Sequence, residues 1–585
     1  MAKRFIPKRW SIHSHDPSRI AALSQAAGIP AVVAQLLICR GITDPADAKV
    51  FLDPKLTALR DPELLPGCAD AAARIHAAIQ DGKRIIVYGD YDVDGMTGSA
   101  LLVLCLKLLG GNVGYYIPNR IDEGYGLNEA AIRAKADEGA QLIISVDCGI
   151  GSLDEAAVAR EVGVELIITD HHEPGEELPD ASAIVHPRLP GAGYPFGGLS
   201  GSGVALKLAW ALCQQAAGAK RVGQKMRDFL MQAVGFASMG TVADVVPLVD
   251  ENRVLVCHGL RSLSQYPSLG ISTLMKVTQL HAKKQLDSED IGYTIGPRLN
   301  AAGRLGQPQL GVELLVTENA ERARELAEYI HELNDNRQTL ERSIVRAAGK
   351  QAKEKFDPVA DSALVLADRG WHAGVIGIVA GRIAEKYHRP VVVISFDPLG
   401  IKPGVGSARS VPGFNLYAAL KQCDEFLLGC GGHTAAAGLQ IEESQLEGFR
   451  AAFCEVAARE ISEENRVGQL NIDAEAALSE FTLASVRQIE RLEPFGEANP
   501  RPLLCASNVT LARPPKTMGK DGNHLNLELD QHGVRLRAVA FGAGEWAEEL
   551  TNLNGPIDIA FRPKINVYGG RQSVQLYLED WRPTA

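Results

Sequence analysis

Short apolar runs alternate with segments of helical periodicity between about residues 71 and 244. Four of the runs have the length of a buried strand: 84–88, 112–117, 142–146 and 164–169. The segments between them predict helices. This alternation is typical of a parallel sheet covered by helices on both faces, so we expect an α/β fold for this part of the chain.

A long segment from about residue 314 to 355 is rich in Glu and Arg and has one apolar stripe at helical spacing. The stripe consists of Leu326, Ile330, Leu333, Leu340 and Ile344. We expect a single long helix that connects two lobes. A second, smaller α/β unit follows, with strands at 363–367 and 391–395 and a helix at 374–387.

The chain after about residue 466 has a different pattern, in which short strands alternate with turns. Strands are expected at 524–529, 534–541, 557–567 and 573–577. Such spacing is typical of a small β-barrel, which we interpret as an OB-like fold. The predicted organisation has five parts: an N-terminal segment (1–45), a parallel-sheet domain (46–315), a connecting helix (316–358), a second α/β domain (359–465) and an OB-like barrel (466–585).

The composition is that of a folded protein without a membrane anchor. Hydrophobic residues make up 46% of the 585 positions, and no apolar run approaches the roughly 20 residues of a membrane span. The ten cysteines form no Cys-x-x-Cys pair and the first ten residues lack the apolar core of a secretory signal, so we expect a cytoplasmic protein. The net charge of −11 argues against a protein that coats duplex DNA but leaves room for a local basic channel.

Three carboxylates lie within five residues directly after the first predicted strand. They are Asp90, Asp92 and Asp94, followed by Gly95. The spacing also fits the start of a calcium-binding EF-hand loop, but that loop needs a Glu at its twelfth position, where this chain has Leu101. Burying three like charges together is costly unless a cation neutralises them. A metal site therefore explains the run better than a turn or a helix cap does.

Further candidate ligands follow other strands of the same predicted sheet. They are Asp147 after the strand at 142–146, and Asp170, His171 and His172 after the strand at 164–169. In a parallel sheet, ligands bind at the edge where the carboxyl ends of the strands meet. Asp244 lies in an apolar run, where a buried carboxylate needs a partner. Carboxylates combined with imidazole favour two divalent cations, Mn²⁺ or Mg²⁺, over a thiolate zinc site.

These motifs resemble those of the DHH phosphoesterase superfamily. They are Asp92 and Asp94, Asp147, Asp170-His171-His172, and Asp244. Three later segments resemble the accessory domain associated with DHH proteins: 370–377, 406–410 and 431–438. The order of the domains is similar to that of the RecJ family of bacterial exonucleases, over nearly the whole chain. Tyr88 stands where some superfamily members have a His, and RecJ-type members share that absence and use Asp90 instead.

The resemblance implies a role for each residue of the metal site. One metal has the ligands Asp92 and Asp147, with Asp90 assisting directly or through water. The other has the ligands Asp94, Asp147, His171 and Asp244, so that Asp147 bridges. His172 contacts the scissile phosphate or protonates the leaving group, and Asp170 orients the histidines.

The resemblance also implies contacts with a nucleic acid. The pocket for a 5′-phosphate consists of Arg120, Ser407 and Arg409, since a guanidinium fork suits that dianionic end. Arg298 and Arg304 bind backbone phosphates near the metals. The competing interpretation of these last two residues is that they form surface or interdomain ion pairs.

Other substrate contacts are expected farther along the chain. His433, in a glycine-rich segment, is expected at the substrate, and the alternative is that the glycines only permit tight packing. In the OB-like barrel, Phe541, Phe561 and Tyr568 are candidates for base stacking or for the core. Their individual roles stay open.

The activity implied is that of a single-stranded-DNA-specific 5′→3′ exonuclease that releases 5′-mononucleotides in recombination and repair. Its expected partners are single-stranded DNA with a 5′ end, a single-strand-binding protein and a helicase, and we expect a monomer that contacts no membrane. A relative that cleaves oligoribonucleotides or cyclic dinucleotides would not need the long C-terminal region, and neither would a pyrophosphatase. A non-catalytic DNA-binding scaffold would have lost ligands, whereas all six candidates are present.

Overall fold

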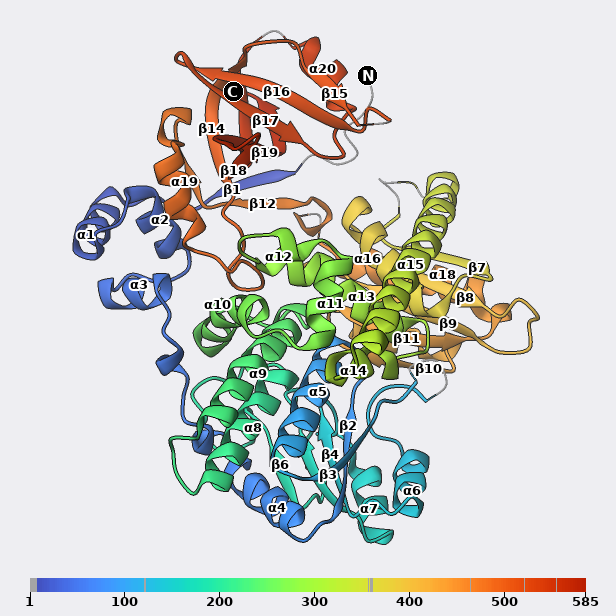
Figure 1. Ribbon diagram of the computed structural model, residues 1–585. Helices are drawn as coiled ribbons and strands as arrows, with labels where there is room; N and C mark the ends of the chain where they lie inside the picture. Colours follow the sequence, from blue (N-terminus) through green and yellow to red (C-terminus); the bar gives the residue numbers. More distant parts are fainter. Residues whose placement is uncertain are drawn as a thin grey trace. The chain divides into compact units, whose positions relative to one another are not determined.

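The computed structural model describes residues 8–119, 123–355, 357, 361–462, 464–519, 521–553 and 555–584. Two compact units can be distinguished in it (Figure 1). The first contains residues 59–246 and 250–468, and the second contains 8–58, 247–249 and 469–585. Among the described residues no single helix could span a membrane by length and hydropathy, and one bent pair, Pro17–Ala27 with Ala31–Cys39, meets that test.

The first unit contains a five-stranded parallel sheet in the order β3-β2-β4-β5-β6. Its strands are β2 (Arg84–Gly89), β3 (Asn112–Tyr116), β4 (Leu142–Val146), β5 (Glu165–Thr169) and β6 (Ala183–Val185). Every residue of the central strand β4 is buried. Helices cover both faces of the sheet, so the side chains on both sides of each strand are mostly apolar. The strands therefore read as unbroken apolar runs, without the alternation of apolar and polar residues that a solvent-exposed face produces. The predicted parallel sheet is confirmed, and β6 is an additional short strand.

Helices cover both faces of this sheet (Figure 1). One face carries α5 (Val93–Leu108) and α8 (Gly201–Ala217), with α4 (Cys68–Gln80) packed on α8, and the other carries α6 (Glu129–Asp137) and α7 (Leu153–Glu161). Helix α9 (Gln224–Ala243) packs on α5 and α8. Because neighbours enclose α5 on every side, it has no polar face, and it carries its first-turn residue Asp94 into the interior.

The rest of the first domain is helical and leads into one long helix. It comprises α10 (Asp250–Gln265), α11 (Leu269–Val277), α12 (Ser288–Asp290), α13 (Gly296–Arg304), α14 (Gln309–Val316) and α15 (Ala320–Lys355). Helix α15 has 36 residues and occupies the segment in which a connecting helix is expected. It packs on α11, α13 and α14 and also on α16 (Ala373–Tyr387) of the second α/β domain.

The buried side of α15 differs from the predicted stripe at one position. Leu340 is 38% exposed, whereas Asn334, Arg337 and Glu341 are buried in the middle of the helix. Glu341 pairs with Arg337 at 2.5 Å and with Arg382 of α16 at 2.6 Å. Positions 334, 337 and 341 continue the three- and four-residue spacing, and Arg337 joins the other two by donating hydrogen bonds to Glu341 Oε2 and Asn334 Oδ1. The prediction that Leu340 belongs to the buried apolar stripe is therefore wrong.

The second α/β domain has a mixed sheet in the order β10-β11-β9-β8-β7. Its strands are β7 (Leu364–Arg369), β8 (Val391–Phe396), β9 (Gly404–Arg409), β10 (Gly429–Gly432) and β11 (Ala436–Ile441). Only β7 and β8 run parallel to each other among these neighbours. Helices α15 and α16 pack on one face, and α17 (Leu416–Lys421) and α18 (Leu446–Glu460) pack on the other.

The second unit contains a seven-stranded sheet in the order β13-β14-β18-β19-β17-β16-β15, and pairing of β14 with β16 closes the five strands from β14 to β16 into a barrel. The strands are β13 (Ala474–Glu475), β14 (Leu504–Leu511), β15 (Lys516–Met518), β16 (His524–Gln531), β17 (Val534–Ala540), β18 (Ile557–Tyr568) and β19 (Arg571–Pro583). Two helices, α19 (Leu483–Glu490) and α20 (Trp546–Thr551), complete it. Closure removes exposed strand edges, and the OB-like barrel is confirmed.

Residues 8–58 belong to this second unit. Strand β1 (Arg9–Ile12) pairs in parallel with β12 (Gln469–Ile472). Three helices follow: α1 (Pro17–Ala27), α2 (Ala31–Cys39) and α3 (Pro45–Leu52). Val33, Leu36 and Leu37 of α2 are fully buried in the same hydrophobic core as the barrel residues. The start of the chain thus completes a core whose other residues lie more than 400 positions away.

Candidate active site

The carboxyl ends of three neighbouring strands carry acidic residues. In the sheet register, Gly89 at the end of β2 pairs with Val146 at the end of β4, and Val146 pairs with Thr169 at the end of β5. The next residue along each strand is Asp90, Asp147 or Asp170. Because the three strands end level with one another, their acidic residues meet at one edge of the sheet, as the strand pattern predicts.

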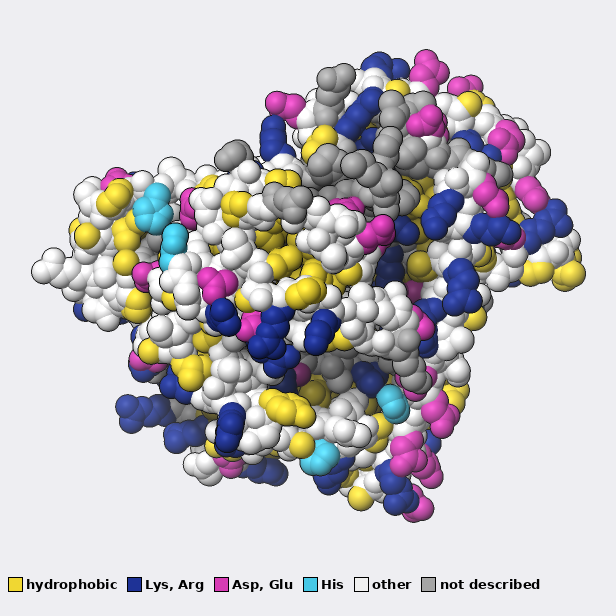
Figure 2. All heavy atoms as spheres, turned by 90° about the horizontal axis from the view of Figure 1, so that it is seen from above, with side chains coloured by type: hydrophobic (Ala, Val, Ile, Leu, Met, Phe, Trp, Pro, Cys, Tyr) yellow, Lys and Arg dark blue, Asp and Glu magenta, His cyan; other side chains and the backbone are white. Residues whose placement is uncertain are grey.

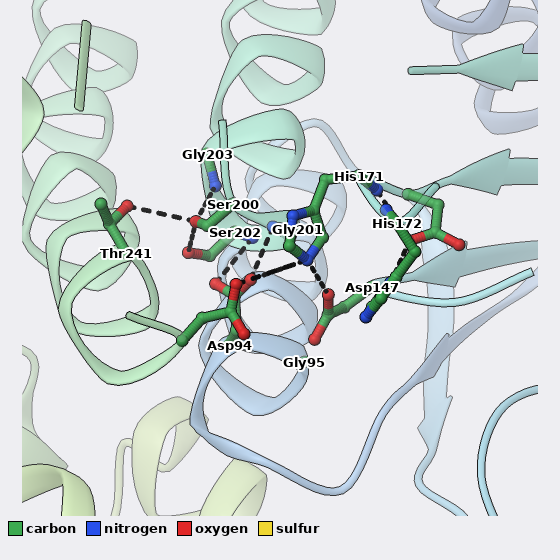
Figure 3. A network of polar contacts seen from close by, with 12 residues as sticks. Asp94, Gly95, Asp147, His171, His172, Ser200, Gly201, Ser202, Gly203 and Thr241 are labelled. Carbon is green, nitrogen blue, oxygen red and sulfur yellow. Dashed lines mark hydrogen bonds and ion pairs between the residues drawn. The ribbon is translucent and has the colours of Figure 1, made fainter. Parts of the chain in front are cut away.

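The N-terminus of α5 holds the other two carboxylates of the first motif. Asp92 caps the helix, and its Oδ1 accepts hydrogen bonds from the backbone N–H groups of Asp94 (2.8 Å) and Gly95 (3.1 Å). Asp94 points to the start of α8, where its carboxylate accepts hydrogen bonds from the N–H groups of Gly201 (2.6 Å) and Ser202 (3.0 Å), as Figure 3 shows. Positive helix ends thus stabilise both negative charges.

All six predicted ligands lie in overlapping groups whose ligand atoms are within 4.8 Å of one another. The groups are Asp90 with Asp92 and Asp147, Asp94 with His171 and Asp244, and Asp147 with His171 and His172. Nε2 of His171 is 3.1 Å from Asp147 Oδ1, 3.5 Å from Asp244 Oδ2 and 4.0 Å from Asp94 Oδ2. Asp147 and His171 therefore connect the two carboxylate groups.

The donor set fits divalent cations. Oδ1 of Asp147 and Nε2 of His171 are buried, and neither makes a hydrogen bond with any residue that the structure describes. Leaving such groups unsatisfied costs roughly 1–3 kcal/mol each, which a coordinated cation would offset. Hard carboxylate oxygens with one imidazole nitrogen suit Mn²⁺ or Mg²⁺.

The electrostatics of the site favour the same conclusion. Burial, and then the charges of Asp94 and Asp92, raise the pKa of Asp147 well above its usual range and that of Asp244 to about 8. Burial lowers the pKa of His171 to about 4, so its imidazole is neutral and able to coordinate a metal. The carboxylates repel one another until a cation is bound among them.

His172 and Asp170 form a separate pair beside these groups. Nδ1 of His172 is 2.7 Å from Asp170 Oδ1, and Asp170 also accepts hydrogen bonds from the backbone N–H groups of Ile150 and His171. Burial opposes the charge on each, but their hydrogen bond lowers the pKa of Asp170 to about 2 and raises that of His172 to about 9. His172 is therefore a cation held in a fixed orientation.

Tyr125 is a site residue that the sequence did not reveal. Its hydroxyl donates a hydrogen bond to the backbone oxygen of Asp147 (3.1 Å) and lies 3.1 Å from Nδ1 of His172. Its ring makes edge contacts with those of Tyr91 and His172. The only sequence feature that marks it is its place between Gly124 and Gly126.

The close approach of three helices also depends on glycines that the sequence did not single out. A Cβ on Gly201 would lie 2.5 Å from Asp147 Oδ1, and a Cβ on Gly240 of α9 would lie 2.0 Å from Asp94 Oδ1. Ser200 Oγ lies 3.1 Å from Thr241 Oγ1 and joins α8 to α9 (Figure 3). The run of small residues at 200–203, just before a helix, is the feature that could have indicated this site.

Two pockets adjoin the metal-ligand groups. One of about 240 Å³ is lined by Asp90, Asp92, Tyr125 and Arg304, among others. The other, of about 890 Å³, is lined by Tyr91 and Arg304 and, from the second α/β domain, by Ser407, Arg409 and His433. Arg304 borders both pockets, so the predicted substrate residues of the two domains face a common space.

Two other predicted substrate residues are placed differently. Arg298 does not line either pocket, and its guanidinium donates hydrogen bonds to His331 Nδ1 (3.1 Å) and to the Thr294 backbone oxygen (2.7 Å). Arg120 lies outside the described residues. Ser407 and Arg409 lie side by side on β9, with Arg409 Nη1 3.3 Å from Ser407 Oγ.

The aromatic candidates in the barrel fall into two kinds. Phe561 is fully buried in the core, whereas Phe541 is 61% and Tyr568 is 85% exposed. The Phe541 ring contacts those of His524 and Tyr577, and Lys564 lies over the Tyr577 ring at 5.1 Å. Phe561 therefore packs in the core, and base stacking stays a prediction for the exposed rings of Phe541 and Tyr568.

Three family models match the chain: the DHH family N-terminal domain at 84–234, the DHHA1 domain at 360–459 and the RecJ OB domain at 472–580. The single-stranded-DNA-specific exonuclease RecJ of Bacillus subtilis is 36% identical over 574 residues, which is 98% of this chain and 70% of the relative. That of Haemophilus influenzae is 35% identical over 547 residues, 91% of this chain and 93% of the relative.

The fold of the whole chain also has a solved counterpart. The crystal structure of RecJ in complex with Mn²⁺ from Thermus thermophilus matches with a TM-score of 0.83 and 31% identity, over 99% of this chain and 80% of that one. A Mg²⁺ complex from the same organism matches with a TM-score of 0.77 and 30% identity, over 99% of this chain and 79% of that one. With the same three domains in the same order along nearly its full length, the chain belongs to the RecJ family.

Proposed function

We propose that the chain is a metal-dependent exonuclease that hydrolyses single-stranded DNA from its 5′ end and releases 5′-mononucleotides. The observation that carries this proposal is the convergence of six ligand side chains in overlapping groups that are linked through Asp147 and His171. The relatives with which the chain shares about a third of its residues are named single-stranded-DNA-specific exonucleases. Recombination and repair are the processes in which such an activity is used.

Two divalent cations, Mn²⁺ or Mg²⁺, fit the ligand groups. We assign Asp90, Asp92 and Asp147 to one cation, and Asp94, Asp147, His171 and Asp244 to the other. When bound, such a pair activates water and stabilises the leaving oxygen of a phosphodiester. The Asp92 and Asp94 side chains are held apart by the backbone N–H groups of two different helices, which supports their assignment to different cations.

His172, oriented by Asp170, is proposed to contact the negatively charged scissile phosphate or to donate a proton to the leaving oxygen. The charged imidazole of His172 lies beside the ligand groups, where it can contact the scissile phosphate or protonate the leaving oxygen. Asp170 accepts a hydrogen bond from His172 and thereby fixes the direction of the other ring nitrogen. Asp170 is thus a positioning residue and His172 a catalytic one.

The larger pocket supports a role in recognising the strand end. Ser407 and Arg409 are proposed, with Arg120, to bind the 5′-phosphate, because an arginine fork matches a phosphate. Arg304 and His433 line the same pocket and are proposed to contact the terminal nucleotide. Arg298 is proposed to bind a backbone phosphate, with its contact to His331 orienting the guanidinium.

The barrel supports additional binding of the strand. Phe541 and Tyr568 are exposed aromatic rings on which bases could stack, each worth about 1–3 kcal/mol. The net charge of −11 does not oppose this, because basic and acidic side chains are intermixed over the face shown in Figure 2. In the barrel, Lys564 lies over the ring of Tyr577, which contacts Phe541, so a positive charge lies near an exposed aromatic ring.

We also propose a division of the chain into parts, a localisation, an oligomeric state and partners. The division into parts at 45, 315, 358 and 465 follows the sequence pattern, and the packing of 8–58 with the barrel supports treating them as one functional unit. We propose a cytoplasmic monomer that receives its substrate from a single-strand-binding protein and a helicase. Membership of the RecJ family supports the proposal that these two partners supply the single-stranded substrate.

The proposal is tested with Asp147→Asn, which keeps the shape of the bridging side chain and removes its charge. We expect degradation of 5′-phosphorylated single-stranded DNA in Mn²⁺ to fall more than about 100-fold, since even outer-shell changes at metal sites cost 10–100-fold. The matched control is Asp154→Asn, in the first turn of α7 on the surface, which should be near wild type.

Substrate controls separate the alternatives. Duplex DNA and 3′-end release should be slow compared with 5′-end release of mononucleotides, as followed by mass spectrometry. Full activity of the Asp147→Asn protein, or cleavage in excess chelator, would overturn the assignment of the metal site. Preference for oligoribonucleotides over DNA would favour the alternative activity.

A further inference from the structure

The larger pocket continues past the residues proposed to bind the 5′-phosphate. Side chains of alternate residues on β9 lie on one face, and Val405, Ser407 and Arg409 all line the pocket of about 890 Å³. Val405 is four residues from Arg409, which corresponds to about 13 Å along a strand. The pocket therefore extends well beyond the phosphate pair.

The two ends of the pocket have different neighbours. At the Arg409 end, a Cβ on Gly377 of α16 would lie 2.9 Å from Ser407 Oγ, and one on Gly374 would lie 2.2 Å from the Arg304 backbone oxygen. This end is thus joined to the residues beside the metal-ligand groups. At the other end, Val405 pairs with Gln440 of β11, and Gln440 pairs with Gly429 of β10. We call this second region, made of Lys402, Val405, Gly429 and Gln440, the far end.

The far end has the chemistry of a nucleotide site. Lys402 offers an ammonium group to a phosphate, and Gln440 offers both donors and an acceptor to the edge of a base. Val405 is 41% exposed and offers an apolar contact. A volume of about 890 Å³ lies near the upper end of the 300–1,000 Å³ typical of small-molecule pockets, so the space exceeds what one terminal nucleotide needs.

At Gly429 the floor of the far end has no side chain, although the fold leaves room for one. Gly429 has no positive φ, and a Cβ on it would meet no atom within 4 Å. Glycine in a strand costs roughly 0.5–1 kcal/mol relative to alanine. Neither backbone conformation nor packing against the described residues accounts for a glycine at position 429, whereas close approach of a bound molecule does.

We propose that the far end binds a nucleoside phosphate that is joined to the 5′-phosphate of the DNA by a phosphoanhydride bond. The enzyme then also removes capped terminal nucleotides, an activity that rests on the proposed exonuclease function. Ser407 and Arg409 hold the phosphate of the terminal nucleotide, Lys402 holds the added phosphate, and the added nucleoside lies on the glycine floor against Val405 and Gln440.

The reaction is the same phosphodiester hydrolysis at the same bond of the DNA strand. Water attacks the phosphorus between the first and second nucleotides, and the bond from that phosphorus to the 3′-oxygen of the first nucleotide breaks. The 3′-oxygen takes a proton and becomes a hydroxyl. The products are a dinucleotide with its phosphoanhydride intact and a strand with a new 5′-phosphate, so atoms and electrons balance without a further reactant.

The test compares one single-stranded oligonucleotide with a 5′-phosphate and the same oligonucleotide with a 5′-adenylyl cap. We expect the full-length wild-type enzyme with Mn²⁺ to release the intact adenylylated nucleotide, identified by mass, with kcat/KM within about tenfold of the 5′-phosphorylated strand. Gly429→Trp fills the far end, and we expect it to lower kcat/KM for the capped strand at least tenfold while the 5′-phosphorylated strand changes less than twofold. Lys402→Ala should raise KM for the capped strand alone.

A matched control is Gly349→Trp on α15, where a Cβ likewise meets nothing within 4 Å and which does not line the pocket. It should leave both substrates unchanged. Degradation of the phosphorylated strand without any release of the capped nucleotide would overturn the inference and leave the exonuclease function intact. Equal loss on both substrates in Gly429→Trp would mean that the far end holds the terminal nucleotide itself. Failure to degrade either strand would overturn the exonuclease function.

Discussion

At the scale of single residues, the site brings buried carboxylates so close together that the pKa values of Asp147 and Asp244 are raised. Asp244 has a pKa of about 8 because it is buried and faces Asp94 and Asp92, against a usual value of 3.8. A group with a raised folded-state pKa stabilises the protein fully below the usual value, and that stability is lost as the pH rises through the folded pKa. The metal-free protein is therefore expected to lose stability between about pH 4 and 8.

This protonation predicts a pH dependence of metal binding. Below about pH 8 the metal-free site holds a proton on Asp244, which a bound cation must displace. Displacing this proton should raise the affinity for Mn²⁺ by up to about tenfold per pH unit between pH 6 and 8, and Asp147, whose pKa burial also raises, adds to the rise. His171, with a pKa of about 4, contributes nothing in this range.

Isothermal titration calorimetry at pH 6, 7 and 8, in buffers of different ionisation enthalpy, would measure both the affinity and the proton released. Asp244→Asn is the control, since it has no proton to displace and should show a weaker dependence. An affinity that does not change with pH would contradict the assignment of Asp244 as a ligand.

At the scale of elements, the position of Asp94 depends on how closely three helices approach. Asp94 is on α5, its two N–H donors are on α8, and Gly240 of α9 closes the other side. A Cβ on Gly240 would lie 2.0 Å from Asp94 Oδ1 and 2.1 Å from Ser202 Oγ. The helix junction therefore has no room for even one additional methyl group.

Gly240→Ala is expected to displace the Asp94 carboxylate by about an ångström or more. A misplacement of that size can cost about 100-fold in rate, so we expect kcat to fall by that order while the protein stays folded. Gly381→Ala on α16 is the matched control, because its Cβ would meet nothing within 4 Å and both changes raise helix propensity by roughly the same amount. Equal rates for the two variants would show that α9 does not fix Asp94.

At the scale of the whole molecule, the chain is organised into units that do not follow its order. Residues 8–58 complete the barrel core with residues beyond 469, while 59–246 and 250–468 form the other unit. The metal-ligand groups and the larger pocket both lie within this other unit. Removal of helices α1 to α3 should therefore lower the stability of the barrel more than it changes metal binding.

Leu37→Ala tests this organisation. Leu37 is fully buried in the barrel core, and such truncations cost about 2–5 kcal/mol. We expect the unfolding free energy of the barrel unit to fall by that amount in urea denaturation, with Mn²⁺ affinity unchanged. Val50→Ala, at a 60% exposed position of α3, should change it by less than about 0.5 kcal/mol. A large effect of Leu37→Ala on Mn²⁺ affinity would contradict the independence of the two units.

Local pattern determined the strands of the first domain and the acidic residues at their ends. An apolar run of five residues with Asp directly after it predicts both a buried strand and a ligand at the sheet edge, because the carboxyl ends of parallel strands meet there. Asp90, Asp147 and His171 could therefore be predicted from sequence periodicity and residue chemistry. Asp244 has no strand before it, and only its place in an apolar run and the family motif indicated it.

Only the tertiary structure decided the contacts that depend on distant segments. Tyr125 reaches Asp147 and His172 because a loop folds over the sheet edge, and Gly240 meets Asp94 because two helices cross. The polar side chains of α15 and the union of residues 8–58 with the barrel likewise depend on which surfaces pack together. Periodicity reports how much of a segment is buried, whereas the identity of the neighbour is set by packing of the whole chain.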